Sequence, residues 1–168
     1  MATVLLVPFE SIEKEVLGEI ERNVSDILKL DVRFAEIVKL PSTRKRGEQL
    51  NAEDFIPVIH QKVAEAGTDY GLGITDKDLY IEELDFVFGL AYRDSSVIAL
   101  ARLRSEDKLL FLKRTVKEAV HELGHLLGLN HCPDEKCVMH FSNNLADTDY
   151  KNEVPCKDCK EKLRAKNA

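Results

Sequence analysis

Apolar and polar residues alternate with two different periods along the N-terminal part of the chain, which predicts strands and helices in turn. Residues 3–7 form a nearly continuous apolar run, as in a strand buried on both faces. Residues 12–28 then place apolar side chains at helical spacing, at Ile12, Val16, Ile20, Val24 and Ile27. Ser11 stands where a helix N-cap is expected, and Glu13 and Glu15 put negative charge near the positive end of the helix dipole.

Further elements follow in the same alternation. Residues 32–40 resemble a strand, and a second helix is expected over residues 56–66, with Pro57 in its first turn and an end at Gly67. The remaining expected segments are a polar connection at 41–47, a strand at 69–74, a polar loop at 75–78, and strands at 86–92 and 97–103. Only residues 93–96 separate the last two strands, so we expect them to form an antiparallel hairpin.

A long helix comes next, and its apolar stripe contains Leu112, Val116, Ala119, Leu123 and Leu127. Gly128 lies where a helix ends with a positive φ. Beyond Gly128 the periodic patterns fade, and the chain becomes rich in Cys, Asn, Asp and Lys. These observations predict an α/β (α+β) fold and one domain over residues 1–168. It would comprise an N-terminal subdomain, 1–128, ending in the long helix, and a C-terminal subdomain, 129–168.

The amino-acid composition and the net charge limit the classes of protein to which the chain can belong. The chain has 168 residues, 44% of them hydrophobic and 32% charged, which is typical of a soluble globular domain. A formal net charge of −6 argues against binding to nucleic acid or to an anionic membrane, both of which require a basic surface. The N-terminus lacks the basic residues and the cleavage site of a signal peptide. We therefore expect a cytoplasmic monomer without membrane contact.

The long helix carries a pattern of metal ligands. His121 and His125 are separated by about 40° around the helix axis, so both imidazoles project from one face. Gly128 allows the chain to reverse, which can bring His131 back as a third ligand. Three protein ligands leave one position open for water, as in a catalytic zinc site. Zinc lowers the pKa of its water toward about 7, and Glu122 would accept the proton and pass it to the leaving amine.

Four cysteines indicate a second metal. Cys132 and Cys137 form one closely spaced pair, and Cys156 and Cys159 form another. Two such pairs in a reducing compartment favour a closed, structural Cys₄ zinc over disulfides or a redox pair. The prediction is therefore two Zn²⁺ ions per chain, one catalytic and one structural. Because Cys132 is adjacent to His131, we hypothesise that the structural zinc pre-organises the catalytic site.

These motifs carry a resemblance to a known family. Residues 121–131 match the HExxHxxGxxH signature of metzincin metallopeptidases, and residues 137–141 resemble their Met-turn, with Met139 beneath the zinc. The four cysteines fit the additional pattern of the archaemetzincins. The resemblance, carried by residues 121–159, implies zinc-dependent hydrolysis of a peptide or protein substrate. It also implies a metzincin-like zincin fold with a mixed twisted sheet, an active-site helix and a small zinc-stapled C-terminal subdomain.

The resemblance implies two further details. Residues 86–92 become the candidate for an edge strand that holds the substrate in extended form. Some metzincins have a Tyr two residues after the Met-turn Met, where it can stabilise an oxyanion, but here that position is Phe141. Help of that kind would then come from zinc, from the backbone, or from another residue such as Tyr150.

Two other functions compete with hydrolysis. One is a catalytically silent, zinc-dependent peptide- or protein-binding module with the same fold, against which Glu122 argues, since zinc retention alone needs no carboxylate there. The other is a nucleic-acid-binding zinc module built on the four cysteines and the mildly basic segment after Tyr150. His60 and His140 are expected to have structural roles, without a metal.

Overall fold

A five-stranded sheet forms the centre of the computed structural model, which describes residues 1–167. The strand order is β2-β1-β5-β9-β8, and only β8 pairs in the antiparallel sense. The strands are β1 (Thr3–Pro8), β2 (Asp31–Phe34), β5 (Tyr70–Thr75), β8 (Gly89–Tyr92) and β9 (Ser95–Ala99). The sheet is thus mixed, as expected, and its β8 edge is the antiparallel one.

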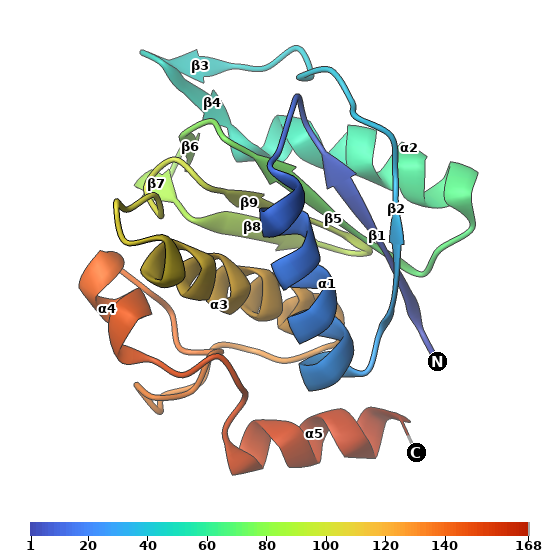
Figure 1. The fold of residues 1–168 in the computed structure, drawn as a ribbon, viewed down its shortest axis with the longest axis vertical. Coiled ribbons are helices and arrows are strands. Elements are labelled where there is room, and N and C mark those ends of the chain that lie inside the picture. Colours follow the sequence, from blue (N-terminus) through green and yellow to red (C-terminus); the bar gives the residue numbers. More distant parts are fainter. Residues whose placement is uncertain (168) are drawn as a thin grey trace.

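Helices cover both faces of this sheet (Figure 1). Helices α1 (Lys14–Leu28) and α3 (Lys108–Leu126) pack on one face, and α2 (Ile56–Ala66) packs on the other. Successive residues of β1 point to opposite faces, so Val4 and Leu6 join the core under α1 and α3 while Leu5 and Val7 join the core under α2. This arrangement explains why β1 is an unbroken apolar run.

Several predicted boundaries are confirmed. Helix α2 spans the predicted residues and ends at Gly67, which has a φ of 71°. The predicted antiparallel hairpin is β8–β9, but its second strand covers Ser95–Ala99 and not 97–103, and Tyr92 lies opposite Ser95, which leaves a two-residue turn. Helix α3 starts at an N-cap, Asp107, whose carboxylate accepts a hydrogen bond from Leu110 N at 3.2 Å.

Other predictions are wrong in detail. Ser11 is not the N-cap of α1, because the helix begins at Lys14 and Glu13 occupies the cap position. The strand predicted over 32–40 ends at Phe34, and only an isolated bridge between Phe9 and Val38 continues it. The strand predicted over 86–92 is divided between two sheets. Its first part belongs to β7 (Leu84–Val87), and the chain then crosses at Phe88 into β8.

The polar region between residues 41 and 51, together with residues 79–87, forms a second, smaller sheet. Its order is β3-β4-β6-β7, and its members are β3 (Lys45–Arg46), β4 (Gln49–Asn51), β6 (Leu79–Ile81) and β7. A short 3₁₀ helix, η1 (Ala52–Phe55), connects β4 to α2. Arg46 holds the β6–β7 turn by donating to Leu84 O at 2.9 Å, and its guanidinium lies 4.2 Å from the centroid of the Tyr80 ring.

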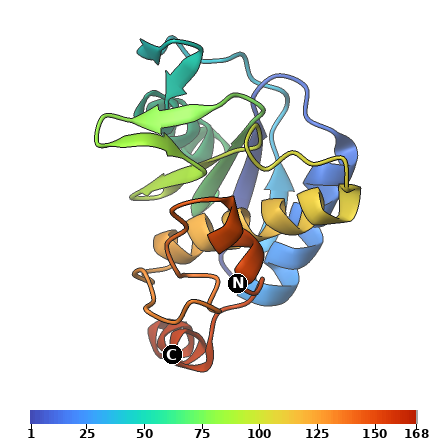
Figure 2. The same cartoon turned by 90° about the vertical axis from the view of Figure 1, so that its left-hand side faces the viewer.

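The C-terminal segment, residues 129–167, adds no strand to either sheet. It contains α4 (Leu145–Tyr150) and α5 (Lys157–Asn167) joined by irregular chain. No helix within residues 1–167 combines the length and the apolar composition that crossing a membrane requires. Figure 2 shows α3 as a layer between the sheets above it and this segment below it. Helix α3 therefore has buried contacts on both sides, and the candidate site lies at its C-terminal end.

Candidate metal centres

Two histidines of α3 meet at one point in space. His121 Nδ1 donates to Val138 O at 2.8 Å, and His125 Nδ1 donates to Leu129 O at 2.9 Å. Because a carbonyl oxygen can only accept, each imidazole carries its proton on Nδ1 and leaves Nε2 with a free lone pair. The two Nε2 atoms are 3.2 Å apart, and two acceptors cannot hydrogen-bond to each other. Both lone pairs instead face a common point suited to a cation.

His131 completes the group. The chain leaves α3 through Gly128, whose φ of 97° is a left-handed conformation that suits glycine. The His131 ring centroid then lies 4.8 Å from that of His125 and 5.4 Å from that of His121. One ligand atom from each of the three histidines lies within 4.8 Å of the others. The predicted reversal of the chain at Gly128 does bring the third histidine back to the first two.

The donor set fits zinc. Tetrahedral coordination with zinc–nitrogen bonds of about 2.0–2.1 Å places two ligand nitrogens about 3.3 Å apart, close to the separation of the two helical Nε2 atoms. Burial lowers the pKa of His121, His125 and His131, so the neutral forms that bind metals are favoured. The two Nδ1–H···O=C bonds fix the ring orientations, as commonly seen behind metal-ligating histidines.

Glu122 lies beside the three histidines and beneath the edge strand. It is buried, and its Oε1 is 3.9 Å from His121 Nε2. Burial, and then the neighbouring Glu118 carboxylate, raises the pKa of Glu122 to about 8. A Cβ atom at Gly89 would lie 2.8 Å from Glu122 Cγ, so only glycine leaves room for this side chain under β8. Gly89 is a site residue that the sequence analysis missed.

Met139 packs against the helix between its two histidines. The residue is fully buried, and Met139 O accepts from Cys132 N at 3.0 Å, which joins the turn to the residue after His131. A Cβ atom at Gly124 would lie 2.4 Å from Met139 Sδ. Gly124 therefore permits the close approach of Met139. A glycine inside a helix costs stability, and that unfavourable choice was the available signal for its role.

The four cysteines form the second cluster, and one ligand atom from each lies within 4.8 Å of the others. Cys132 Sγ and Cys156 Sγ are 3.8 Å apart, and so are Cys137 Sγ and Cys159 Sγ. Zinc–sulfur bonds of about 2.3 Å in a tetrahedron give a sulfur–sulfur distance of about 3.8 Å, whereas a disulfide needs about 2.05 Å. The spacing is that of a Cys₄ metal site.

Backbone N–H groups and burial act in opposite directions on the charge of the cysteine sulfurs. Cys137 Sγ accepts from Cys156 N at 3.2 Å and from Met139 N at 3.4 Å. Burial raises the pKa of Cys137 and Cys159, so these thiols ionise with difficulty unless a cation compensates the charge. A bound metal supplies that compensation.

A charged face of α3 lies under α4, and the sequence analysis did not predict it. Arg114 donates to both carboxylate oxygens of Asp149, at 2.8 and 2.9 Å. Lys117 Nζ donates to Thr148 O at 3.0 Å, at the C-terminal end of α4, where a cation is favourable. Arg114 and Lys117 precede His121 on the same side of the helix, so these contacts attach the C-terminal segment to the ligand-bearing face.

A buried ion pair extends this charged face toward the histidine cluster. Glu118 Oε1 accepts from the Thr148 hydroxyl at 3.0 Å and lies 3.6 Å from Lys151 Nζ. Lys151 is buried, and its Nζ donates to His140 O at 3.0 Å, directly after Met139. His140 Nδ1 in turn donates to Cys132 O at 2.8 Å. These bonds link α3, the Met139 turn and the residue that follows His131.

The sequence analysis also considered Phe141, Tyr150 and His60, which belong to neither cluster. The Phe141 ring centroid is 5.2 Å from that of His131, at the position implied by the resemblance. Tyr150 is exposed, and Lys136 Nζ lies 3.9 Å from its ring centroid. Tyr150 is not among the described residues that line the cavity beside Glu122, so nothing in the structure supports it as an oxyanion donor. His60 is an exposed residue that bonds to Asp94 at 2.9 Å.

Comparison with known proteins agrees with this geometry. The family model described as "Peptidase family M54" matches residues 1–165. The chain belongs to peptidase family M54. It is therefore a zinc metallopeptidase, and the resemblance to the archaemetzincins is confirmed.

Individual members of the family are similar over almost the whole chain. The archaemetzincin of Pyrococcus furiosus is 36% identical, over 95% of this chain and 91% of its own length. That of Saccharolobus islandicus is 38% identical, over 95% and 92%. Among solved structures, archaemetzincin from Methanopyrus kandleri aligns with a TM-score of 0.89 and 35% identity, covering 99% of this chain and 95% of that one. The Archaeoglobus fulgidus archaemetzincin gives a TM-score of 0.84 and 30% identity, over 95% and 99%. The metzincin-like fold is thereby confirmed.

Proposed function

We propose that this M54 peptidase hydrolyses peptide bonds at a zinc held by His121, His125 and His131, with Glu122 as the general acid and base. The observation that carries the proposal is the arrangement of the His121 and His125 Nε2 atoms, which are 3.2 Å apart with their lone pairs free. The buried Glu122 carboxylate lies beside them. When bound, zinc would supply a water of lowered pKa and polarise the scissile carbonyl. No Tyr hydroxyl supports that carbonyl, because the corresponding residue is Phe141.

Glu122 would move the protons of the reaction. As a carboxylate, it would accept a proton from the attacking water and later donate that proton to the nitrogen of the leaving amine. Its buried position favours the protonated form between those two steps, because burial disfavours the charge. The bare backbone of Gly89 keeps Glu122 close to the histidines.

The substrate would lie along β8. This strand is an edge of the five-stranded sheet, so one side of its backbone is not paired within the sheet. An extended peptide can add to that side as a further strand. Antiparallel addition is the more stable arrangement per residue, and it would direct the C-terminal half of the peptide toward Gly89.

A second zinc would complete the enzyme. We propose that Cys132, Cys137, Cys156 and Cys159 hold it in a closed shell, for a total of two Zn²⁺ per chain, with Met139 and Gly128 supporting the catalytic site. Support comes from the Cys132–Cys156 and Cys137–Cys159 sulfur pairs, each 3.8 Å apart, which is the distance that tetrahedral zinc coordination requires. We further propose that residues 1–168 act as one catalytic domain.

The test combines metal analysis with peptide cleavage. The wild type, Glu122→Gln and His125→Ala would be assayed for zinc content and for turnover of a fluorogenic peptide library. We expect two zincs in the wild type and in Glu122→Gln, one zinc in His125→Ala, and turnover in the wild type alone. Loss of the Glu122 carboxylate should lower kcat by about 10²–10⁴-fold. A wild type with two zincs and no turnover would instead favour the silent binding module.

A further inference from the structure

A cavity of about 180 Å³ opens beside His121 and Glu122. One wall is the crossing from β7 into β8, residues 84–89, and the opposite wall is the segment after Met139, residues 141–143. Glu118, one helical turn before Glu122, completes the lining. Drug-sized ligands occupy about 300–1,000 Å³, so this cavity is suited to a single side chain.

The cavity would receive the residue that follows the scissile bond. A peptide antiparallel to β8 would point its C-terminal half toward Gly89, and residues 84–89 form the near wall of the cavity. The inference therefore rests on the proposed function and adds to it the class of side chain that the enzyme selects.

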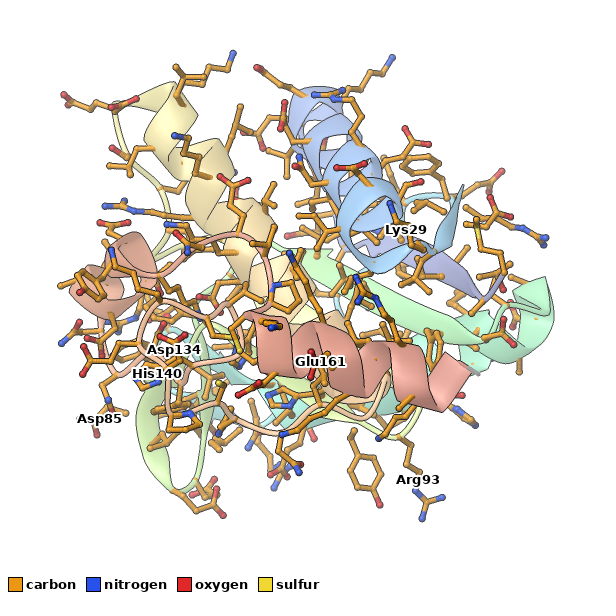
Figure 3. All side chains as sticks on the ribbon, turned by 90° about the horizontal axis from the view of Figure 1, so that it is seen from below. Lys29, Asp85, Arg93, Asp134, His140 and Glu161 are labelled. Carbon is orange, nitrogen blue, oxygen red and sulfur yellow. The ribbon has the colours of Figure 1, made fainter. Side chains whose placement is uncertain are left out.

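All charged groups of the lining are acidic. Asp85 is exposed and stands at the margin of the molecule (Figure 3). Glu118 is buried, and Glu122, also buried, has its Oε1 3.9 Å from His121 Nε2. Of the described residues that line the cavity, none is Lys or Arg. Two cations lie near the lining, but each already has a carboxylate partner: Lys151 pairs with Glu118 of the lining, and Arg102 pairs with Asp78 outside it. Lys151 lies 3.6 Å from Glu118 Oε1, and Arg102 donates to Asp78 at 2.8 and 3.0 Å.

Acceptor atoms remain for a substrate. Glu118 Oε1 takes the contacts from Thr148 and Lys151, while within residues 1–167 the second oxygen, Oε2, accepts no hydrogen bond. Ser142 Oγ is buried and has no hydrogen-bond partner among the described residues. The walls between these groups and the cavity mouth are apolar, with Phe86, Val87 and Phe141 among them. Such walls suit the methylene stem of a long cationic side chain.

We propose that this cavity selects a lysine or arginine side chain immediately C-terminal to the scissile bond, and that Glu118 and Asp85 determine this preference. The stem packs between the aromatic walls, and the cationic head approaches the Glu118 carboxylate. A glutamate in the same place meets the carboxylates of Asp85 and Glu118, and no Lys or Arg of the lining pairs with it.

The test uses three peptides that differ only in the residue after the scissile bond, which is Arg, Leu or Glu. For the zinc-loaded wild type, we expect kcat/KM to be at least about tenfold higher for Arg than for Glu. Glu118→Gln should lower that ratio about tenfold, and Asp85→Asn, a change at an exposed position, by a smaller factor of about threefold. Asp85→Asn keeps the test valid if Glu118→Gln disturbs folding by leaving Lys151 without its carboxylate.

Binding separates this inference from hydrolysis itself. The same peptides would be titrated into zinc-loaded Glu122→Gln by calorimetry. Tighter binding of the Arg peptide without turnover in the wild type would retain the specificity and reject the hydrolytic function. Equal kcat/KM for Arg and Glu in the wild type, or a ratio unchanged in both variants, would overturn the specificity while leaving hydrolysis in place.

Discussion

The two ligand clusters are neighbours in the sequence, but they hold their shape by different means. In the histidine cluster, neutral imidazoles are fixed by hydrogen bonds from Nδ1 to Val138 O and Leu129 O. In the cysteine cluster, four groups that become anions on binding metal are brought together, two of them on buried residues. The histidine cluster can keep its arrangement without a metal, whereas the cysteine cluster reaches its thiolate form only when a cation compensates the charge.

The three histidines also differ in which part of the protein holds them in position. His121 and His125 are carried by α3, whose apolar face is packed under the sheet together with α1. His131 and Met139 belong to the C-terminal segment, which the cysteines and the charged contacts of α3 hold in place. The positions of His121 and His125 therefore depend on the core, and the position of His131 depends on the segment that the proposed cysteine-bound zinc would hold.

Losing the cysteine-bound metal should give the largest effect. We expect Cys156→Ser to release the C-terminal segment, because a structural zinc contributes an apparent free energy of about 10–16 kcal/mol in zinc-finger peptides. Hydrogen exchange should rise over residues 129–167 and stay low in α1 and the five-stranded sheet. Zinc content should fall by more than one ion per chain, because His131 loses its support. Asp158→Asn, an exposed change between two cysteines, is the control. Full zinc occupancy of the histidines in Cys156→Ser would contradict the hypothesis of pre-organisation.

Breaking the buried ion pair comes next. Lys151→Met leaves Glu118 buried without its cation, and we expect a loss of about 3–5 kcal/mol in the free energy of unfolding. Urea denaturation measures it, with the exposed Lys157→Met as the control. Glu118→Leu combined with Lys151→Met should recover most of the loss, because two apolar groups no longer leave a lone charge. Additive losses in the double variant would show that the pair is not coupled.

A smaller effect is expected where Met139 meets the helix. Gly124→Ala should lower the free energy of unfolding by about 1–3 kcal/mol, because the new methyl group would overlap Met139 Sδ. The matched control is Gly18→Ala in α1, where the new Cβ would lie 3.4 Å from the flexible end of the Arg22 side chain. That control should stabilise the protein by about 0.5–1 kcal/mol, since alanine favours helices. Thermal melting compares the two, and a gain in both would mean that Met139 moves aside freely.

The smallest effect should come from the cap of α4. Asn144 Oδ1 accepts from Asp147 N at 2.9 Å, and Asn144→Ala should cost about 1 kcal/mol. Because Asn144→Ala leaves the contacts of Arg114 and Lys117 with α4 in place, zinc content should remain that of the wild type. A drop in histidine-bound zinc would show that the segment is held less firmly than the Arg114 and Lys117 contacts suggest.

The sequence allowed the long elements to be predicted because their periodicity is repeated many times. Helix α2 agrees with the prediction at both ends, and the β8–β9 hairpin was recognised from its short turn. The small sheet was missed because β3, β4 and β6 have two or three residues each, too few to establish a period of two. Ser11 had the residue type of a cap, but the helix starts two residues beyond the position that such a cap requires.

For the site, the residues with a fixed spacing were predictable, and those that depend on tertiary contact were not. His121, His125, His131 and the four cysteines come together as expected. Gly89 and Gly124 escaped notice because their role is to leave space for residues distant in the sequence. The ion pair of Glu118 and Lys151 was not predicted, because two residues 33 positions apart form no local sequence pattern. A charged residue in a helix is also ordinarily expected to be exposed to solvent.

The position of His131 outside α3 has a consequence for the newly made polypeptide. Residues up to Leu126 contain every strand of both sheets but only two of the three histidine ligands. A chain emerging from the ribosome can thus complete its sheets while the catalytic group is still unfinished. In the proposed mechanism, peptide cleavage waits until residues through Cys159 have been synthesised and have taken up metal. A folding intermediate that ends before His131 therefore lacks a side chain that the proposed mechanism requires.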